Sequence, residues 1–236
     1  MTTAATQLLF DAPIIQTLPV TGLAKLYPVS RIFCVGRNYA AHAAEMGGEV
    51  DREAPWYFTK SAQALCQSNQ SVPYPPGTSN FHHEIELVIA LGGPIFQGDE
   101  SRAQDAIFGY ACGLDMTRRD RQQDGKDARR PWSLGKDVEN GAVIGEITPC
   151  TDIGPIGPQR MTLAVNGETR QDALLSDMVW TVTEIISHLS QFYHLNAGDL
   201  IMTGTPAGVG PVVAGDTITG QIDGLKPISH QLSAAE

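Results

Sequence analysis

The sequence is poor in positive charge. Its 236 residues include 16 Lys and Arg against 26 Asp and Glu, which gives a formal net charge of −10. Nucleic acids and anionic membrane surfaces are bound through net basic faces. The composition therefore argues against both classes of partner.

Cysteines are few, and long apolar runs are missing. Cys34, Cys66, Cys112 and Cys150 are widely spaced and include no Cys-x-x-Cys pair, which predicts reduced thiols rather than a disulfide or zinc framework. No apolar run approaches the length needed to cross a bilayer, and residues 1–7 lack the basic start and apolar core of a secretory signal. We expect a cytoplasmic protein.

Long helical patterns are also scarce, because 24 Gly and 15 Pro interrupt the chain. The 42% of hydrophobic residues nevertheless suffice for a core, and the length fits one large domain. We expect residues 1–28 to form an N-terminal extension with one or two strands, and residues 29–236 to form the body.

Two acids in the first half of the chain alternate with apolar residues. Ile85, Leu87 and Ile89 would share one face of a strand, and Glu84 and Glu86 the other. Both carboxylates would then reach a common hard cation. A half-buried strand with a solvated acidic face explains this stretch equally well.

A third acid ends a second predicted strand. Gly109, Ala111, Gly113 and Asp115 fall on one face, so the acid follows three positions with almost no side chain. Space for a ligand and close packing of another strand both account for this pattern.

A short helix is predicted from Tyr39 to Met46, with Asn38 as its N-cap. His42 and Glu45 are three residues apart and therefore share a face of this helix. So short a helix needs to dock on the body, which is why we interpret it as a lid. The spacing alone favours an exposed ion pair.

Three further patterns concern the second half. Residues 118–136 hold 7 of the 16 Lys and Arg, which indicates either an anion site or, for most of the charges, a solvated salt-bridged loop. Asn166-Gly167 predicts a hairpin, and the capping box from Thr181 to Glu184 begins a helix. The glycine-rich residues 203–210 precede no helical pattern, which favours a wall of a small-molecule site over a nucleotide loop.

Separated motifs together resemble the fumarylacetoacetate hydrolase family, and within it the small acylpyruvases. They are CVGRNYA (34–40) with His42 and Glu45, FTK (58–60), HHEIEL (82–87), LDMTRRD (114–120) and TGTPAGVGP (203–211). The resemblance runs from about residue 27 to the end of the chain. It implies an α+β, strand-rich fold, a mixed β-sandwich roll, usually assembled as a homodimer.

The resemblance also implies a metal site and a catalytic set. Glu84, Glu86 and Asp115 match the carboxylates that hold a divalent cation, and an all-oxygen set favours Mg²⁺ or Mn²⁺. His42 would be the base that activates water, and Glu45 would orient it. Lys136 would stabilise developing negative charge.

Four residues match positions of the substrate wall: Arg119 and Gln122, with Lys60 and Thr205 as weaker candidates. The implied reaction is hydrolysis of a carbon–carbon bond in a 3-acylpyruvate, with fumarylpyruvate, cleaved to fumarate and pyruvate, as the expected substrate. Decarboxylation of oxaloacetate or tautomerisation of a 2-oxo acid on the same metal site is the alternative. A metal-binding protein without catalysis is disfavoured, since His42 and Glu45 are both present.

Overall fold

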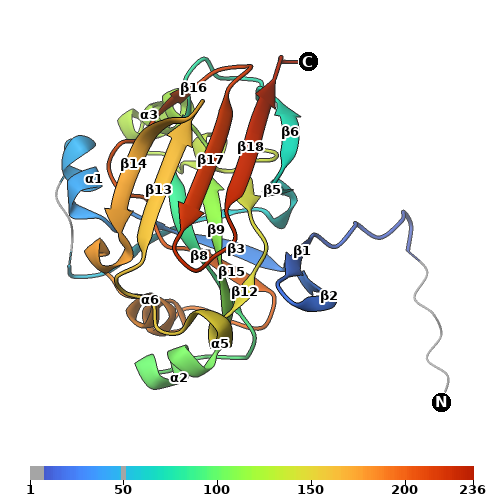
Figure 1. Ribbon diagram of the computed structural model, residues 1–236, viewed down its shortest axis with the longest axis vertical. Coiled ribbons are helices and arrows are strands. Elements are labelled where there is room, and N and C mark those ends of the chain that lie inside the picture. The colour runs from blue at the N-terminus through green and yellow to red at the C-terminus, as the bar shows by residue number, and fades with distance from the viewer. Residues whose placement is uncertain (1–7, 49–51) are drawn as a thin grey trace.

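Two large sheets pack face to face in the computed structural model, which describes residues 8–48 and 52–236 (Figure 1). Seven strands of the first sheet follow the order β4 (Trp56–Lys60), β3 (Arg31–Gly36), β15 (Asp199–Met202), β8 (Ile85–Leu91), β9 (Ile107–Asp115), β11 (Ala142–Ile144) and β5 (Leu65–Gln67), and β12 (Thr148–Pro149) also pairs with β9. The second sheet follows the order β14 (Glu168–Leu174), β13 (Arg160–Val165), β17 (Thr217–Ile222), β18 (Ile228–Ser233) and β6 (Gln70–Pro73). Parallel and antiparallel pairs occur in both sheets. The predicted α+β mixed sandwich is therefore confirmed.

Smaller elements surround the sandwich. One small sheet contains β10 (Thr117–Arg118), β7 (Phe81–His83) and β16 (Gly210–Val212), and a hairpin contains β1 (Thr17–Val20) and β2 (Leu23–Pro28). The α-helices are α1 (Ala40–Glu45), α2 (Glu100–Asp105), α3 (Arg119–Asp127), α4 (Ser133–Lys136), α5 (Cys150–Ile153) and α6 (Val182–Leu189), with 3₁₀ turns η1 (Ala62–Ala64) and η2 (Leu175–Asp177). None of the helices in the described ranges is long and apolar enough to cross a membrane.

Strand β8 lies between two hydrophobic cores, one on each face of the first sheet. Ile85, Leu87 and Ile89 belong to the core between the two sheets, as their alternation predicts. Val88 and Ala90 point to a second core on the opposite face of the first sheet. Every residue of β8 is buried. The interpretation of this stretch as a strand with a solvated acidic face is therefore wrong.

Residues 17–28 contribute to that second core. Leu18, Val20 and Tyr27 are buried in it, and the Tyr27 hydroxyl donates to the carbonyl oxygen of Leu91 at 2.7 Å. The amide of Gly198 donates to the same hydroxyl at 3.0 Å. One or two strands were expected within residues 1–28, and the hairpin contains two. Residues 1–7 of the predicted extension lie outside the described residues.

The structure confirms the predicted hairpin turn and the predicted helix cap in the second half of the chain. Asn166 and Gly167 have φ values of 53° and 82° and connect β13 to β14. Thr181 caps α6, and Glu184 reaches back to complete the capping box. All four cysteines lie in the described ranges as free thiols.

The basic stretch at residues 118–136 is helical rather than a loop. It forms α3 and α4, which bury the side chains of Arg119, Gln122 and Lys136. The expectation of solvated, salt-bridged charge holds for Arg121, which is exposed and lies 3.0 Å from Asp124 Oδ2. The prediction of a loop failed because these helices bury polar side chains, so the apolar periodicity that reveals a helix is missing.

Candidate active site

Three carboxylates converge where β7, β8 and β9 meet. Glu84 lies between β7 and β8, Glu86 is the second residue of β8, and Asp115 ends β9. The amide of Asp115 donates to the carbonyl oxygen of Glu84 at 2.8 Å, which brings the strand ends together. One oxygen from each carboxylate lies within 4.8 Å of the others, and all three side chains are buried. Hard oxygen donors in this arrangement fit Mg²⁺ or Mn²⁺.

The small residues of β9 serve strand packing. A Cβ atom on Gly109 would lie 2.4 Å from the carbonyl oxygen of Thr148, and one on Gly113 would lie 2.6 Å from Cγ2 of Val88. Both contacts are shorter than carbon atoms tolerate. Of the two explanations left open by the sequence, close packing is therefore the correct one at these positions.

Three buried cations pair with two of the three carboxylates. The Lys136 ammonium lies 2.6 Å from both Glu84 Oε2 and Asp115 Oδ2, Lys60 lies 2.7 Å from Asp115 Oδ1, and Arg119 pairs with Glu84 Oε1. Burial alone would raise the pKa of Glu84, but Lys136 and Arg119 outweigh burial and hold that pKa well below its usual value.

Glu86 is in a different environment. No ion pair to it occurs among the described residues, and its Oε2 accepts a hydrogen bond from the amide of Gly204 at 2.8 Å. Burial, followed by the charges of Asp115 and Glu84, raises the pKa of Glu86 well above its usual value. A divalent cation between these groups would reverse that repulsion, so the charge distribution fits a metal site.

His42 and Glu45 form a hydrogen-bonded pair on α1. His42 Nδ1 lies 3.2 Å from Glu45 Oε2, and both oxygens of Glu45 accept from the amide of Gly208, at 3.1 and 3.2 Å. His42 is buried, and burial lowers its pKa below the usual value. A neutral imidazole whose Nδ1–H points to a carboxylate leaves Nε2 as an acceptor, which is the form a base requires.

The predicted cap of this helix is wrong in one detail. Tyr39, not Asn38, is the N-cap, and no side chain caps the helix. The Asn38 amide instead donates to the carbonyl oxygens of Thr203 and Trp180, at 2.8 and 3.0 Å. Asn38 thus attaches the start of the helix to the glycine-rich loop at residues 203–210.

Helices α3 and α4 supply the other side of the site. Arg119 and Gln122 are one turn apart on α3, and Arg119 Nη1 donates to Gln122 Oε1 at 2.6 Å. A Cβ atom on Gly135 would lie 2.7 Å from the backbone nitrogen of Gln122, so α4 packs directly on α3. This packing places Lys136, the last residue of α4, beside Glu84.

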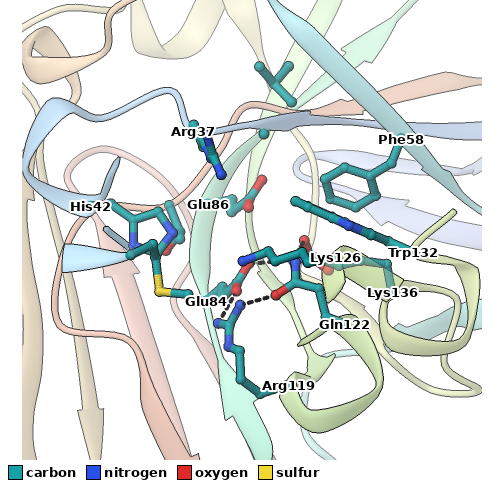
Figure 2. A pocket seen from close by; sticks show the side chains of 15 residues that line it. Arg37, His42, Phe58, Glu84, Glu86, Arg119, Gln122, Lys126, Trp132 and Lys136 are labelled. Carbon is teal, nitrogen blue, oxygen red and sulfur yellow. Dashed lines mark hydrogen bonds and ion pairs between the residues drawn. The ribbon is translucent and has the colours of Figure 1, made fainter. Parts of the chain in front are cut away.

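Most of the predicted site residues line one cavity (Figure 2). Eight of them do so, namely His42, Glu84, Glu86, Asp115, Arg119, Gln122, Lys136 and Thr205. Glu45 stands behind His42. The Lys60 side chain is fully buried behind Asp115 and donates to the carbonyl oxygen of Met116 at 3.1 Å, so it does not line the cavity.

The cavity lining also contains residues that were not among the predicted site residues: Val35, Gly36, Arg37, Met46, Phe58, Lys126 and Trp132. A signal for Lys126 was present, because it follows Arg119 by seven residues and Gln122 by four, and so shares their face of a helix. Without a predicted helix in that stretch, the spacing carried no information. Arg37 lies in the recognised CVGRNYA motif, but no local pattern distinguishes it from a surface arginine.

Comparison with known proteins gives the family. Residues 31–233 match the sequence family described as the fumarylacetoacetate hydrolase C-terminal domain. A fumarylpyruvate hydrolase of Ralstonia is 50% identical over 193 residues, which is 81% of this chain and 100% of the relative. An oxaloacetate tautomerase of Escherichia coli is 40% identical over 199 residues, covering 84% of this chain and 90% of that one.

A solved structure agrees closely in fold. The crystal structure of fumarylpyruvate hydrolase from Pseudomonas aeruginosa, in complex with Mn²⁺ and pyruvate, superimposes with a TM-score of 0.93 at 40% identity, covering 97% of this chain and 100% of that chain. The sequence motifs, the carboxylate cluster and these matches agree. The chain belongs to the fumarylacetoacetate hydrolase family.

Proposed function

We propose that the protein hydrolyses the carbon–carbon bond of a 3-acylpyruvate, with fumarylpyruvate as the substrate and fumarate and pyruvate as the products. The observation that carries this proposal is that a neutral, carboxylate-oriented His42 lines the same cavity as three buried carboxylates. The relative that is 50% identical over its whole length bears the name of this activity.

Glu84, Glu86 and Asp115 are the proposed ligands of Mg²⁺ or Mn²⁺. The related crystal structure contains Mn²⁺, and Mg²⁺ suits the same set of oxygen donors. When bound, such an ion supplies Lewis-acid stabilisation for the negatively charged 2-oxo acid end of the substrate.

His42 is proposed as the general base. Its Nε2 takes a proton from water, and the resulting hydroxide adds to the carbonyl carbon of the acyl group. The bond between that carbon and C3 of the pyruvate portion then breaks, and C3 takes up a proton. Glu45 positions the imidazole through Nδ1, and the loop amide of Gly208 in turn holds Glu45.

The remaining predicted residues are assigned to the pyruvate portion. Burial would lower the pKa of the Lys136 ammonium, but Asp115 and Glu84 raise it, so the group remains charged and can stabilise the negative charge that develops on the leaving fragment. Arg119 and Gln122 face the same cavity and offer donors to a carboxylate. Thr205 Oγ1 accepts from Gln171 at 2.8 Å, which leaves its hydroxyl hydrogen free to donate to substrate.

Tautomerisation of oxaloacetate is the second candidate, favoured by the 40% identical tautomerase. That reaction moves a proton and needs no attacking water. We also propose, from the family resemblance, a homodimer that works in the cytoplasm.

One assay panel separates the candidates. Purified protein with Mg²⁺ is tested for hydrolysis of fumarylpyruvate and for tautomerisation and decarboxylation of oxaloacetate, with and without a chelator. We expect metal-dependent release of pyruvate, and in His42→Ala a loss of at least about 100-fold in kcat with Mg²⁺ binding retained. Hydrolysis that is unaffected by the chelator, or a wild-type enzyme that acts on oxaloacetate alone, would refute the hydrolase proposal.

A further inference from the structure

Two cations of the cavity are not used by the proposed chemistry. Arg37 and Lys126 both line it, yet neither forms an ion pair with any acid in the described part of the chain. The other cavity cations, Arg119 and Lys136, are neutralised by Glu84 and Asp115. Among residues 8–48 and 52–236, Arg37 and Lys126 therefore carry charge that no acid pairs with.

Arg37 is held in an unusual conformation. It follows the last residue of β3 with φ of 57°, in the left-handed region that disfavours side chains with a Cβ atom. Its guanidinium carbon lies 5.6 Å from the ring centre of Trp56, and its Nη1 lies 3.1 Å from where a Cβ atom of Gly48 would be. An aromatic ring and a glycine thus position this guanidinium without neutralising it.

Lys126 is held in the same way. It is half-buried on α3, and its ammonium lies 5.2 Å from the ring centre of Trp132. The rings of Trp132 and Trp56 are in edge contact, with centres 4.2 Å apart. The two tryptophans therefore form a continuous aromatic support that carries one cation at each end. In Figure 2 Arg37 and Lys126 are drawn on different sides of Glu86.

The charges of the site indicate what these cations bind. With all three acids ionised, as metal binding favours, Glu84, Glu86 and Asp115 are matched in number by Lys60, Lys136 and Arg119, so the charges of these protein groups sum to zero around the ion. Loading Mg²⁺ or Mn²⁺ adds two positive charges. A substrate with a single carboxylate compensates one of them and leaves Arg37 and Lys126 without a counter-ion. A substrate with a second carboxylate at its far end supplies one.

We propose that Arg37 and Lys126 form a binding site for the distal carboxylate of the substrate, which makes the enzyme selective for dicarboxylate 3-acylpyruvates over monocarboxylate ones. This inference rests on the proposed hydrolase function. It adds two specificity-determining residues to the predicted set, on the α1 side of the cavity and on α3. Charge-assisted hydrogen bonds to a carboxylate give the site its selectivity.

The test compares fumarylpyruvate with acetylpyruvate, which lacks the distal carboxylate. Arg37→Asn removes the charge with a residue that tolerates positive φ, and Lys126→Met removes the ammonium while keeping the length of the side chain. Each substitution should lower kcat/KM for fumarylpyruvate about 10- to 100-fold more than for acetylpyruvate, mainly through KM. Arg37→Lys should recover part of the selectivity.

Arg129→Asn is the matched control. Arg129 also has positive φ, of 52°, is exposed, and lies outside the cavity lining. Its replacement should leave both substrates unaffected. Wild-type hydrolysis of neither substrate would remove the hydrolase function itself. Hydrolysis of both substrates with equal losses in the two variants would leave that function intact and overturn the distal-carboxylate site.

Discussion

The backbone amide of Gly208 donates to both carboxylate oxygens of Glu45, at 3.1 and 3.2 Å. Four residues earlier in the same loop, the amide of Gly204 donates to Glu86 at 2.8 Å. One loop therefore positions the partner of the proposed base and one proposed metal ligand. Movement of this loop would alter both halves of the site together.

Gly208→Ala should therefore impair catalysis. Gly208 has φ of 94°, and a Cβ atom there would lie 2.1 Å from the carbonyl oxygen of Arg170, so the loop must shift away from Glu45. Gly215→Ala is the matched control, because Gly215 has φ of 97° with open space around the Cβ position. Both variants should lose about 1–2 kcal/mol of stability from the left-handed conformation. Only Gly208→Ala should lower kcat, and equal kcat values in steady-state assays would contradict the role of the loop.

Lys60→Met should destabilise the fold. The Lys60 ammonium is fully buried and lies 2.7 Å from Asp115 Oδ1, so its removal leaves a buried carboxylate with one partner fewer. Losing one member of such a pair destabilises by about 3–5 kcal/mol. Urea denaturation in the presence of a chelator measures the loss, with exposed Lys25→Met as the control. If the ion pair is the cause, Asp115→Asn combined with Lys60→Met will lose less than the sum of the two single variants.

Glu86→Gln should have opposite effects on metal binding and on metal-free stability. The pKa of Glu86 is raised by burial and by Asp115 and Glu84, so its charged form is unfavourable at neutral pH in the absence of metal. The substitution should raise the melting temperature of the chelator-treated protein and weaken Mg²⁺ binding about 10-fold or more in calorimetric titration. Exposed Glu168→Gln should change neither quantity. A metal affinity equal to that of the wild type would show that Glu86 is not a ligand.

The acid limb of the pH–rate profile should report His42. Burial lowers its pKa, while Glu84 and Glu45 raise it. The neutral base exists above that pKa, so kcat/KM should be constant at neutral pH and fall only below the ordinary imidazole value of about 6.5. Glu45→Gln removes one influence that raises the pKa, so the limb should move further toward acid. A limb that moves toward alkali in this variant would exclude His42 as its source.

Local chemistry made part of this fold predictable. The alternation around Leu87, the Asn-Gly turn at Gly167 and the capping box at Thr181 each depend on residues adjacent in sequence, and the structure confirms all three. The three carboxylates were also found, since a strand period and a family motif both indicated them.

Other features depend on contacts that no local pattern encodes. Helix α3 buries Arg119 and Gln122 where most helices bury apolar residues. Its sequence therefore lacks the apolar periodicity from which a helix is predicted. Asn38 bonds to loops more than 140 residues away instead of capping its helix. A lysine at the end of a strand, such as Lys60, is usually solvated, but here its ammonium is buried in an ion pair with Asp115.

The hairpin at residues 17–28 bears on how the protein can be shortened. Leu18, Val20 and Tyr27 cover the face of the first sheet from which Met202 leads into the loop that positions Glu45 and Glu86. A fragment that begins at residue 29 would expose the apolar face of the first sheet that Leu18, Val20 and Tyr27 cover. The strand that leads into this loop belongs to the same sheet. A shortened enzyme should therefore keep this hairpin together with Gln16, whose carbonyl oxygen accepts from the amide of Val29 at 2.8 Å.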